Sequence, residues 1–422
     1  QTCALPVSPR ENGTIGSRAP VRSQRRCSGA AARRSSFGSP SPSPPPPLAA
    51  LPSPGCVMTS GKNSCLISLC LRLGARSLCA RSPRRPRRRR RRRPAAARSP
   101  SRRRHTIEIP KTNPPAANSF VNLPVVTDWQ DLQAEAVIFG VSHGKPYLAD
   151  QFPNDQSTAP AALRKASPRI LLDGQSLDAD FQRAVCLDDF TIVDGGDIPL
   201  EGGDVQQHYD AAENAVRFAV QRGIMPISIG GDDGVTNPVI RGLDGLSDVT
   251  LIQIDAHLDW RDERYGIHDG YSSPMRRAAE QDHITAIHQI GIRSFGSAKQ
   301  PEIDMARRWG AKIHLAQDIH RHGMAPVIAA LPSSGRFFVT LDVDGLDPSV
   351  MPGTVALAPG GLMWWHIIEL FEALAAKGQI LGLNLVELAP KNDLNQVSMI
   401  GAGRLMLKLI MLQLMKSHGK TG

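Results

Sequence analysis

Two short clusters of acidic residues, Asp255–Asp259 and Asp342–Asp344, constrain the structure of this chain more than any other feature. Each cluster directly follows an apolar run rich in β-branched or aromatic residues, Val249–Ile254 and Phe337–Leu341. Such runs are typical of buried strands, so each cluster is expected where a strand meets its loop. The sequence therefore predicts a concentration of negative charge beyond the ends of neighbouring strands.

The spacing within the clusters predicts that their side chains converge. An extended chain sends residues i, i+2 and i+4 to one side, which directs Asp255, His257 and Asp259 together and likewise Asp342 and Asp344. Five such groups would repel one another strongly unless cations lay between them. Oxygen donors with one imidazole suit Mn²⁺ or a similar borderline divalent ion. Because the groups are too many for one ion, the sequence predicts two metal ions that share carboxylates.

The chain divides into two pieces of opposite charge. Residues 1–105 contain 23 Arg and one Lys but a single acid, Glu11, which gives a net charge of +23. Because the whole chain carries +11, residues 106–422 carry −12. The first piece is rich in Pro, Ser and Arg and can bury little apolar surface, so it is expected to be disordered. Residues 106–422 are expected to form one folded domain.

The basic segment allows several interpretations. The chain starts at Gln1 and its first methionine is Met58, so the segment is expected to be artefactual or processed. The run Arg87–Arg93 leaves nuclear targeting or nucleic-acid binding open for this tail alone, and organelle targeting is a further alternative. Cys65–Leu73, the nearest approach to an apolar run there, is too short to span a bilayer. Since Cys186 is the one cysteine outside the segment, we expect a soluble, cytoplasmic protein in a reducing compartment, without a membrane partner.

From about Thr106 onward, strand-like apolar runs alternate with helix-like stretches. The predicted strands are 137–141, 191–193, 225–229, 249–254, 287–292, 312–315, 337–341 and 380–388, and the predicted helices are 208–222, 237–243, 301–309, 364–377 and 399–415. This alternation predicts a three-layer α/β/α fold, with a mostly parallel sheet between helices on both faces. Ligands in such sheets bind beyond the carboxyl ends of the strands, and the acidic motifs fall there.

Taken together, four motifs resemble the binuclear manganese ureohydrolases, which include arginase and agmatinase. The family shows a Gly-Gly-Asp-His turn, an Asp-Ala-His-x-Asp motif, an Asp-x-Asp-x-x-Asp-Pro motif and a late Glu near a proline. Here these motifs stand as Gly230–Asp233, Asp255–Asp259, Asp342–Pro348 and Val386–Pro390, within a resemblance that covers roughly 130–410. The resemblance implies the α/β fold that arginases share with metal-dependent deacetylases.

The resemblance also implies a set of metal ligands around two Mn²⁺ ions per chain, or Ni²⁺ or Co²⁺ in their place. It assigns Asp255 and Asp342 as carboxylates that bridge the two ions. Asp259 and Asp233 would complete one site, and His257 and Asp344 would complete the other. A hydroxide between the ions would attack a guanidinium carbon, because two cations lower the pKa of a shared water toward neutrality. Asp259 would pass a proton to the departing nitrogen, and Glu387 would pair with the guanidinium group.

Three positions depart from the family pattern. Position 233 is Asp where the family usually has a metal histidine, which gives a harder and more anionic site. The proton-shuttling histidine of the family aligns with Tyr271, and His268, three residues earlier, is the alternative for that role. The stretch 355–361 lacks an acid that many relatives place before its Pro-Gly-Gly turn.

The predicted function is metal-dependent hydrolysis of a guanidino compound to urea and an amine, with agmatine as the default substrate. The charged stretch Trp260–Tyr265 is unlike the arginase pattern, which favours the agmatinase-like branch. A non-catalytic or regulatory subunit, marked by Asp233 and Tyr271, and an amide deacetylase on the same fold are the alternatives. Relatives form trimers or hexamers, so a homo-oligomer is expected by resemblance.

Several other polar residues are interpreted as structural. Asp194 and Asp197 lie at a strand end, and Asp347 precedes Pro348, where it is expected to cap a turn. The histidines His314, His320 and His322 have no paired carboxylate and are expected on the surface. His143 follows the first strand, where relatives have a substrate-side loop. The sequence leaves open whether its side chain lies in the substrate pocket or in the core.

Overall fold

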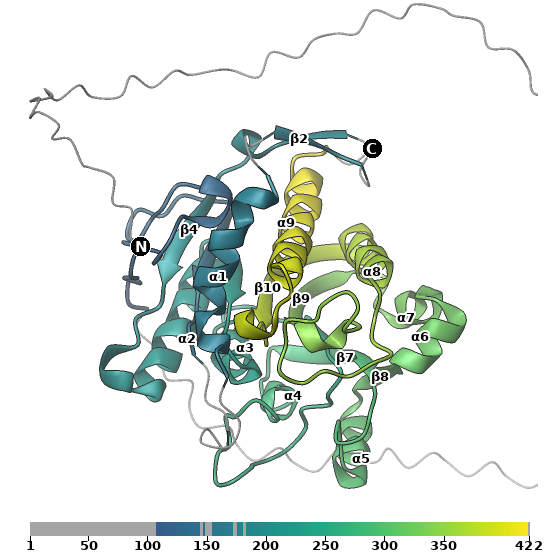
Figure 1. Cartoon of the computed structure of the whole chain (residues 1–422). Coiled ribbons are helices and arrows are strands. Elements are labelled where there is room, and N and C mark those ends of the chain that lie inside the picture. The colour runs from purple at the N-terminus through teal and green to yellow at the C-terminus, as the bar shows by residue number, and fades with distance from the viewer. Residues whose placement is uncertain (1–106, 144–146, 148–153, 172–174, 180–182, 421–422) are drawn as a thin grey trace, which may run out of the picture. The chain divides into compact units, whose positions relative to one another are not determined.

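The computed structural model describes residues 107–143, 147, 154–171, 175–179 and 183–420 (Figure 1). The basic segment 1–105, predicted to be disordered, lies outside the described residues. The fold described below therefore belongs to the acidic part of the chain.

A parallel sheet of eight strands forms the centre of the fold. In spatial order its strands are β4 (Ile192–Asp197), β1 (Ala136–Gly140), β5 (Met225–Ile229), β10 (Gly378–Val386), β9 (Gly335–Asp342), β6 (Val249–Ile254), β7 (Ile284–Ile292) and β8 (Lys312–Leu315). Every neighbouring pair in this sheet is parallel. The middle strands are buried along nearly their whole length, as expected for a sheet covered on both faces.

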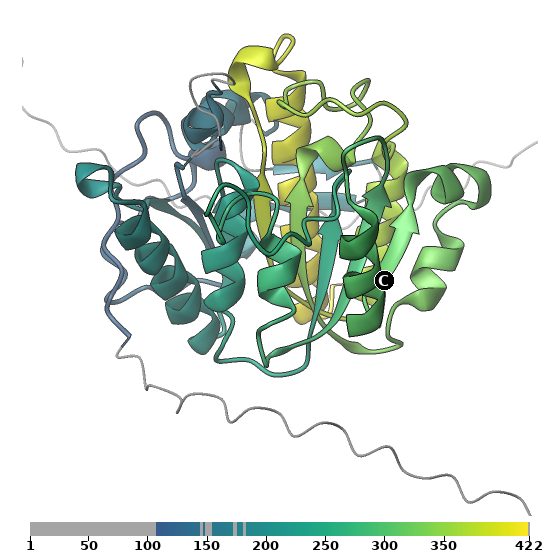
Figure 2. The ribbon, with the colours of Figure 1, turned by 90° about the horizontal axis from the view of Figure 1, so that it is seen from below.

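Helices cover both faces, so the predicted three-layer α/β/α architecture is confirmed (Figure 2). One apolar core lies under α1 (Ala159–Ala166), α6 (Ala316–His322), α7 (Ala325–Ala330), α8 (Trp364–Lys377) and α9 (Val397–Ser417). The opposite core lies under α2 (Val205–Gln221), α3 (Thr236–Arg241), α4 (Pro274–Ala278) and α5 (Gln300–Trp309). Successive strand residues alternate between the two cores, for example Leu251 and Ile252 of β6, because a strand has a period of two.

Among the described residues, one helix is long and apolar enough to cross a membrane. This helix is α9, and 67% of its most apolar window is buried inside the protein. Its side chains pack against α1, α8 and β10. The apolar composition of α9 is therefore that of a core helix.

Predicted elements with strong apolar runs match the structure closely. The strands Met225–Ile229, Val249–Ile254 and Lys312–Leu315 and the helix Trp364–Lys377 have the predicted bounds. The prediction for 191–193 was too short, because β4 continues through Asp194 to Asp197. The elements α1, α4, α6 and α7 and the small antiparallel pair β2 (Gln175–Asp178) and β3 (Arg183–Cys186) were not predicted.

Candidate metal centre

Four adjacent strands deliver acidic side chains to one edge of the sheet. Asp233 follows β5, Glu387 follows β10, Asp342 is the last residue of β9, and Asp255 directly follows β6. Because parallel strands have their carboxyl ends on the same edge, residues separated by more than 150 positions meet here. The first cluster begins where β6 ends at Ile254, as predicted, but its residues converge from a loop and not from an extended strand.

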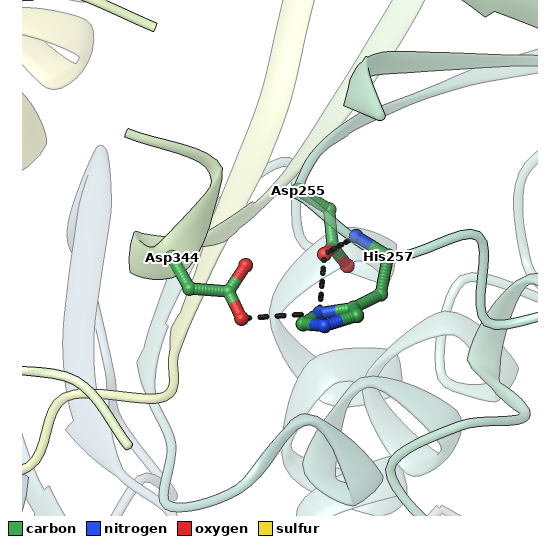
Figure 3. Close-up of side chains that lie close together, drawn as sticks. All are labelled: Asp255, His257 and Asp344. Atoms are coloured by element: carbon green, nitrogen blue, oxygen red, sulfur yellow. Dashed lines mark hydrogen bonds and ion pairs between the residues drawn. The ribbon is translucent and has the colours of Figure 1, made fainter. Parts of the chain in front are cut away.

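The first group of possible metal ligands consists of Asp255, His257 and Asp344 (Figure 3). Nδ1 of His257 lies 3.4 Å from Oδ1 of Asp255 and 3.1 Å from Oδ2 of Asp344. Both carboxylates are buried, whereas the side chain of His257 is 32% exposed. Burial by itself would lower the pKa of His257, but Asp344 and Asp255 outweigh it and raise that pKa to about 11. The two carboxylates thus stabilise positive charge between them strongly, as a cation-binding site requires.

The second group consists of Asp233, Asp255 and Asp342, with ligand oxygens within 4.8 Å of one another. All three residues are buried, and within the described part of the chain Oδ2 of Asp233 has no hydrogen-bond partner. Burial, and then the charge of Asp255, raise the pKa of Asp233 well above its usual range. Burial and the charge of Asp344 do the same for Asp342. Three buried carboxylates with an unpartnered oxygen fit a divalent cation, which would supply the charge that the protein does not.

Asp255 belongs to both groups and therefore joins them. Burial would raise its pKa, but hydrogen bonds from His257 and the charge of that imidazole lower it below the usual value. Two further contacts fix its carboxylate: the backbone N–H of His257 donates to Oδ1 at 2.5 Å, and Nε2 of Gln253 donates to Oδ2 at 2.7 Å. Asp255 is thus held as an anion in a position to contact two ions.

Asp259 lies beside the two close groups and belongs to neither. It is buried, has a left-handed backbone (φ +46°) and accepts a 2.9 Å hydrogen bond from Nε2 of Gln253, the same nitrogen that holds Asp255. Nε2 of Gln289 in turn donates to Oε1 of Gln253 at 2.7 Å. Gln253 and Gln289 were missed by the sequence analysis, because they occupy ordinary positions inside the buried strands β6 and β7.

Arg293 and Asp347 hold the loop that carries Asp344. The guanidinium group of Arg293 donates to the carbonyl oxygens of Asp344, Gly345 and Leu346, at 2.6–3.1 Å. Asp347 accepts from Ser349 and from the backbone N–H groups of Gly360 and Gly361, and these hydrogen bonds lower its pKa to about 2 against the effect of burial. The structure thus confirms the predicted turn-capping role of Asp347.

Glu387 follows the end of β10, and each oxygen of its carboxylate accepts a different hydrogen bond. Its backbone is left-handed (φ +67°), and Oε1 accepts from the backbone N–H of Asp233 at 2.8 Å. Oε2 accepts from Nε2 of Gln156, a residue that the sequence analysis did not single out. Burial, followed by the charge of Asp232, raises the pKa of Glu387 well above its usual range.

A cavity of about 250 Å³ opens onto this centre. The cavity is lined by five residues of the acidic site, His257, Asp259, Asp342, Asp344 and Glu387. The other lining residues include Asn154, Gln156, Trp260, Arg261, Arg264, Tyr271, Ser272, Ser297, Glu302, Val355 and Ala356. The size suits a small linear molecule, since sites for drug-sized ligands span roughly 300–1,000 Å³.

The structure separates the two candidates for the shuttling position. Tyr271 lines the cavity, and burial raises the pKa of its phenol. His268 lies outside the cavity: it is exposed, its Nδ1 is 3.1 Å from the carbonyl oxygen of Asp262, and it borders a different pocket beside Asp232. His268 thus borders a pocket other than the cavity above the acids, and a role for it in proton transfer stays a prediction.

The residues interpreted as structural have packing partners. The guanidinium group of Arg164 pairs with Asp194 at 2.8 Å and with Asp197 at 2.5 Å, inside the protein. His143 is buried, with its ring 5.4 Å from that of Tyr209, and it does not line the cavity. Of the three histidines expected on the surface, His320 and His322 are exposed, but His314 is half-buried because its ring stacks on that of His288 of the neighbouring strand, with ring centroids 5.5 Å apart.

Comparisons with known proteins agree with this geometry. The model of the Arginase family matches residues 134–412. The agmatinase of Bacillus subtilis (strain 168) is 28% identical over 288 residues, which cover 67% of this chain and 93% of that enzyme. An N(1)-aminopropylagmatine ureohydrolase of Thermus thermophilus is 32% identical over 190 residues, but the match spans only 62% of its length and 44% of this chain.

The solved structure of the agmatine ureohydrolase of Thermoplasma volcanium has the same fold. It superimposes with a TM-score of 0.57 at 25% sequence identity, and the alignment covers 68% of this chain and 92% of that protein. The family model spans about two-thirds of the chain and includes every strand end that carries an acidic residue of the site. The chain therefore belongs to the arginase family of hydrolases, in its agmatinase-like branch.

Proposed function

We propose that this protein hydrolyses a small guanidino compound to urea and an amine at a centre of two divalent metal ions. The observation that carries the proposal is the sharing of Asp255 between two groups of buried ligands, beneath a cavity of the right size. One group would hold an ion through Asp233, Asp255 and Asp342, and the other through Asp255, His257 and Asp344. Asp259, which lies beside Asp255, is proposed as a further ligand.

The ions are proposed to be Mn²⁺, with Ni²⁺ or Co²⁺ as substitutes. Two bound cations supply an ionised water near neutral pH, without a separate base in the protein. The mixture of carboxylates with one imidazole supports borderline divalent ions of this kind. The carboxylates themselves, four of which have raised pKa values, become good ligands when a cation replaces their protons.

Glu387 is proposed to orient the substrate. Its carboxylate lines the cavity, and a guanidinium group could replace the amide of Gln156 as its partner. A planar guanidinium and a carboxylate form paired, charge-assisted hydrogen bonds, which would present the central carbon to the attacking water. The pairing would also anchor the substrate by its positive end.

Asp259 is proposed to carry the proton that the reaction moves. Water adds to the guanidinium carbon through a new C–O bond, one C–N bond breaks, and the departing nitrogen must gain a proton to leave as an amine. Burial raises the pKa of Asp259 well above its usual range, and Asp255 adds to this shift. A carboxyl group in that setting can take the proton from the water and give it to the nitrogen. Tyr271 then serves as part of the cavity wall.

A non-catalytic subunit is the second candidate function. It is favoured by Asp233 and Tyr271, which replace two histidines of the family pattern. The two functions differ in their metal content and turnover, because a degenerate centre would bind fewer than two ions and release no urea. A trimeric or hexameric assembly is proposed from the resemblance alone, and a cytoplasmic location from the single cysteine, Cys186, outside the basic segment.

A substrate panel tests the proposed function. The purified full-length protein is loaded with Mn²⁺, Ni²⁺ or Co²⁺ and its metal content measured, and urea release is then followed with agmatine, arginine, 4-guanidinobutyrate and guanidine. We expect close to two ions per chain and turnover of at least one linear guanidino compound. Two bound ions without urea from any member of the panel would rule out the proposal; fewer than two ions would favour the non-catalytic subunit. Agmatine is the default substrate that the sequence predicts, and the residues of the cavity wall determine whether the site favours it over other guanidino compounds.

A further inference from the structure

The wall of the cavity carries two arginines with different surroundings. Arg261 and Arg264 both line the cavity above the acidic floor. Nε of Arg261 is 3.4 Å from Oε1 of Glu302, which also lines the cavity, so this charge is largely compensated. In the described part of the chain, no carboxylate forms an ion pair with Arg264. Among the residues that the structure describes, Arg264 is therefore a lining arginine without an acidic partner.

Arg264 is held in place by aromatic rings. Its guanidinium carbon lies 5.0 Å from the ring centroid of Tyr147 and 5.4 Å from that of Tyr265. The ring of Tyr147 is 4.2 Å from that of Tyr271, and its hydroxyl is 2.9 Å from Oγ of Ser272. Stacking on rings leaves the N–H groups at the edge of a guanidinium free to bind a planar anion. Arg264 is thus a preorganised cation beside Tyr271, at the side of the cavity.

The cavity is lined by charges of both signs. Glu387, Asp259, Asp342 and Asp344 are acidic, and Arg264 is a cation. Agmatine is positive at both ends, so its distal ammonium would meet Arg264 as a like charge. An ω-guanidino acid has a guanidinium at one end and a carboxylate at the other, which matches this arrangement.

We propose that Arg264 binds the carboxylate of a linear ω-guanidino acid, so that this protein hydrolyses guanidino acids in preference to agmatine. The inference rests on the proposed function of the same site. The guanidinium fork of Arg264 would bind both carboxylate oxygens, while Glu387 holds the other end of the molecule. The distance between the two anchors would select the number of methylene groups. Arg264 is therefore a specificity-determining residue.

The first experiment compares kcat/KM for 4-guanidinobutyrate and agmatine in the metal-loaded, full-length protein. We expect the acid to be preferred at least tenfold. The variant Arg264→Gln should lower kcat/KM for the acid on the order of 10–100-fold, mainly through KM, and raise that for agmatine, because the like charge that its distal ammonium meets is removed. Arg264→Lys should recover part of the loss, because it keeps the charge but not the fork.

The matched control is Arg222→Gln. Arg222 also stacks on an aromatic ring, with its guanidinium carbon 3.5 Å from the centroid of Phe218, and it lies at the end of α2 outside the cavity. This variant removes an arginine–aromatic contact without altering the site, so both substrates should keep their wild-type parameters. A fall of equal size for both substrates in Arg264→Gln would overturn the inference and assign Arg264 to support of the tyrosine wall.

A second measurement does not depend on any variant. Inhibition of the wild-type protein is compared between the two amine products, 4-aminobutyrate and 1,4-diaminobutane, with the same substrate. We expect stronger inhibition by the amino acid, because only it has a carboxylate for Arg264. Stronger inhibition by the diamine, or a wild-type preference for agmatine, would reject the inference and leave guanidino hydrolysis intact. If no compound is hydrolysed when two ions are bound, the proposed function itself fails.

Discussion

The two ligand groups of the metal centre share Asp255 but differ in chemistry and exposure. The group of His257 and Asp344 includes an imidazole that is 32% exposed on the cavity side. The group of Asp233 and Asp342 consists of carboxylates alone, all buried, and one oxygen of Asp233 has no partner. The two groups therefore differ in ligand charge: the first includes an imidazole, neutral as a metal ligand, beside two carboxylates, whereas the second consists of three carboxylates.

This difference bears on how the two positions bind metal. An imidazole favours borderline ions such as Mn²⁺, Ni²⁺ or Co²⁺, whereas an all-carboxylate site discriminates less between them and hard ions such as Mg²⁺. Because burial of several carboxylates is costly without a cation, the second group should also have the stronger need for a metal. The shared carboxylate couples the two positions, so a change at Asp255 should affect both and a change at Asp233 mainly one.

The largest effect is expected for Asp255→Asn. The substitution removes the shared negative charge and one acceptor of the carboxylate, so both ions should be lost, and activity should fall on the order of a hundredfold or more. Metal content and urea release measure the two losses. The exposed Asp282→Asn variant, distant from the cavity, controls for a general effect of the substitution. Retention of one ion with near-normal affinity would show that the groups do not share this residue.

A smaller effect is expected for Gln253→Leu, which keeps the size of the side chain but removes its hydrogen bonds. Nε2 of Gln253 donates to Asp255 at 2.7 Å and to Asp259 at 2.9 Å. Removing such an orienting contact typically lowers metal affinity by about 10–100-fold. Calorimetric titration with Mn²⁺ should show both positions weakened, because the contact acts on the shared carboxylate.

The control for that variant is Gln206→Leu, because the side-chain amide of Gln206 donates to Asp210 on the exposed surface of α2. Circular dichroism of both variants checks that the fold is retained. Unchanged titration curves for Gln253→Leu would mean that the loop positions Asp255 without help from the strand.

Much of this centre follows from local sequence, and the reason is topological. An apolar strand followed directly by carboxylates is visible in the sequence, and parallel strands bring their carboxyl ends together whatever their separation along the chain. The acids at 233, 255, 342 and 387 were therefore predictable as one cluster. The conformation of the first cluster was not, because it depends on a loop in which Asp259 adopts a positive φ.

The residues that support the centre leave no comparable signal. In the sequence, Gln253 and Gln289 occupy ordinary strand positions. Gln156 lies in a short helical turn before α1, and it contacts Glu387, which is 231 positions away in the chain. The helix α1 itself was missed because it has eight residues with a proline near its start. Its Arg164 nevertheless forms the buried ion pairs with Asp194 and Asp197. Such contacts are tertiary, and neither propensity nor periodicity records them.

The smallest of these effects, and the sharpest test of the comparison, is expected for Asp233→His. The substitution gives the second position an imidazole in place of a carboxylate, so the two groups become alike in ligand type. We expect preference for Ni²⁺ over Mg²⁺ at that position to rise by about tenfold, since an imidazole favours the borderline ion and one negative charge is lost. Competition titrations followed by metal analysis measure this preference without reference to activity.

The contact of Asp233 with Thr236 sets a limit on this exchange. Oγ1 of Thr236 donates to Oδ1 of Asp233 at 2.5 Å, and a histidine ring at 233 would have to keep or displace that hydroxyl. Thr236→Val in the wild-type background therefore serves as the matched control: it removes the hydroxyl alone and should leave the metal preference unchanged. If Asp233→His and wild type share the same preference, the metal selectivity of this centre is set by the His257 group, and the two positions differ only in burial.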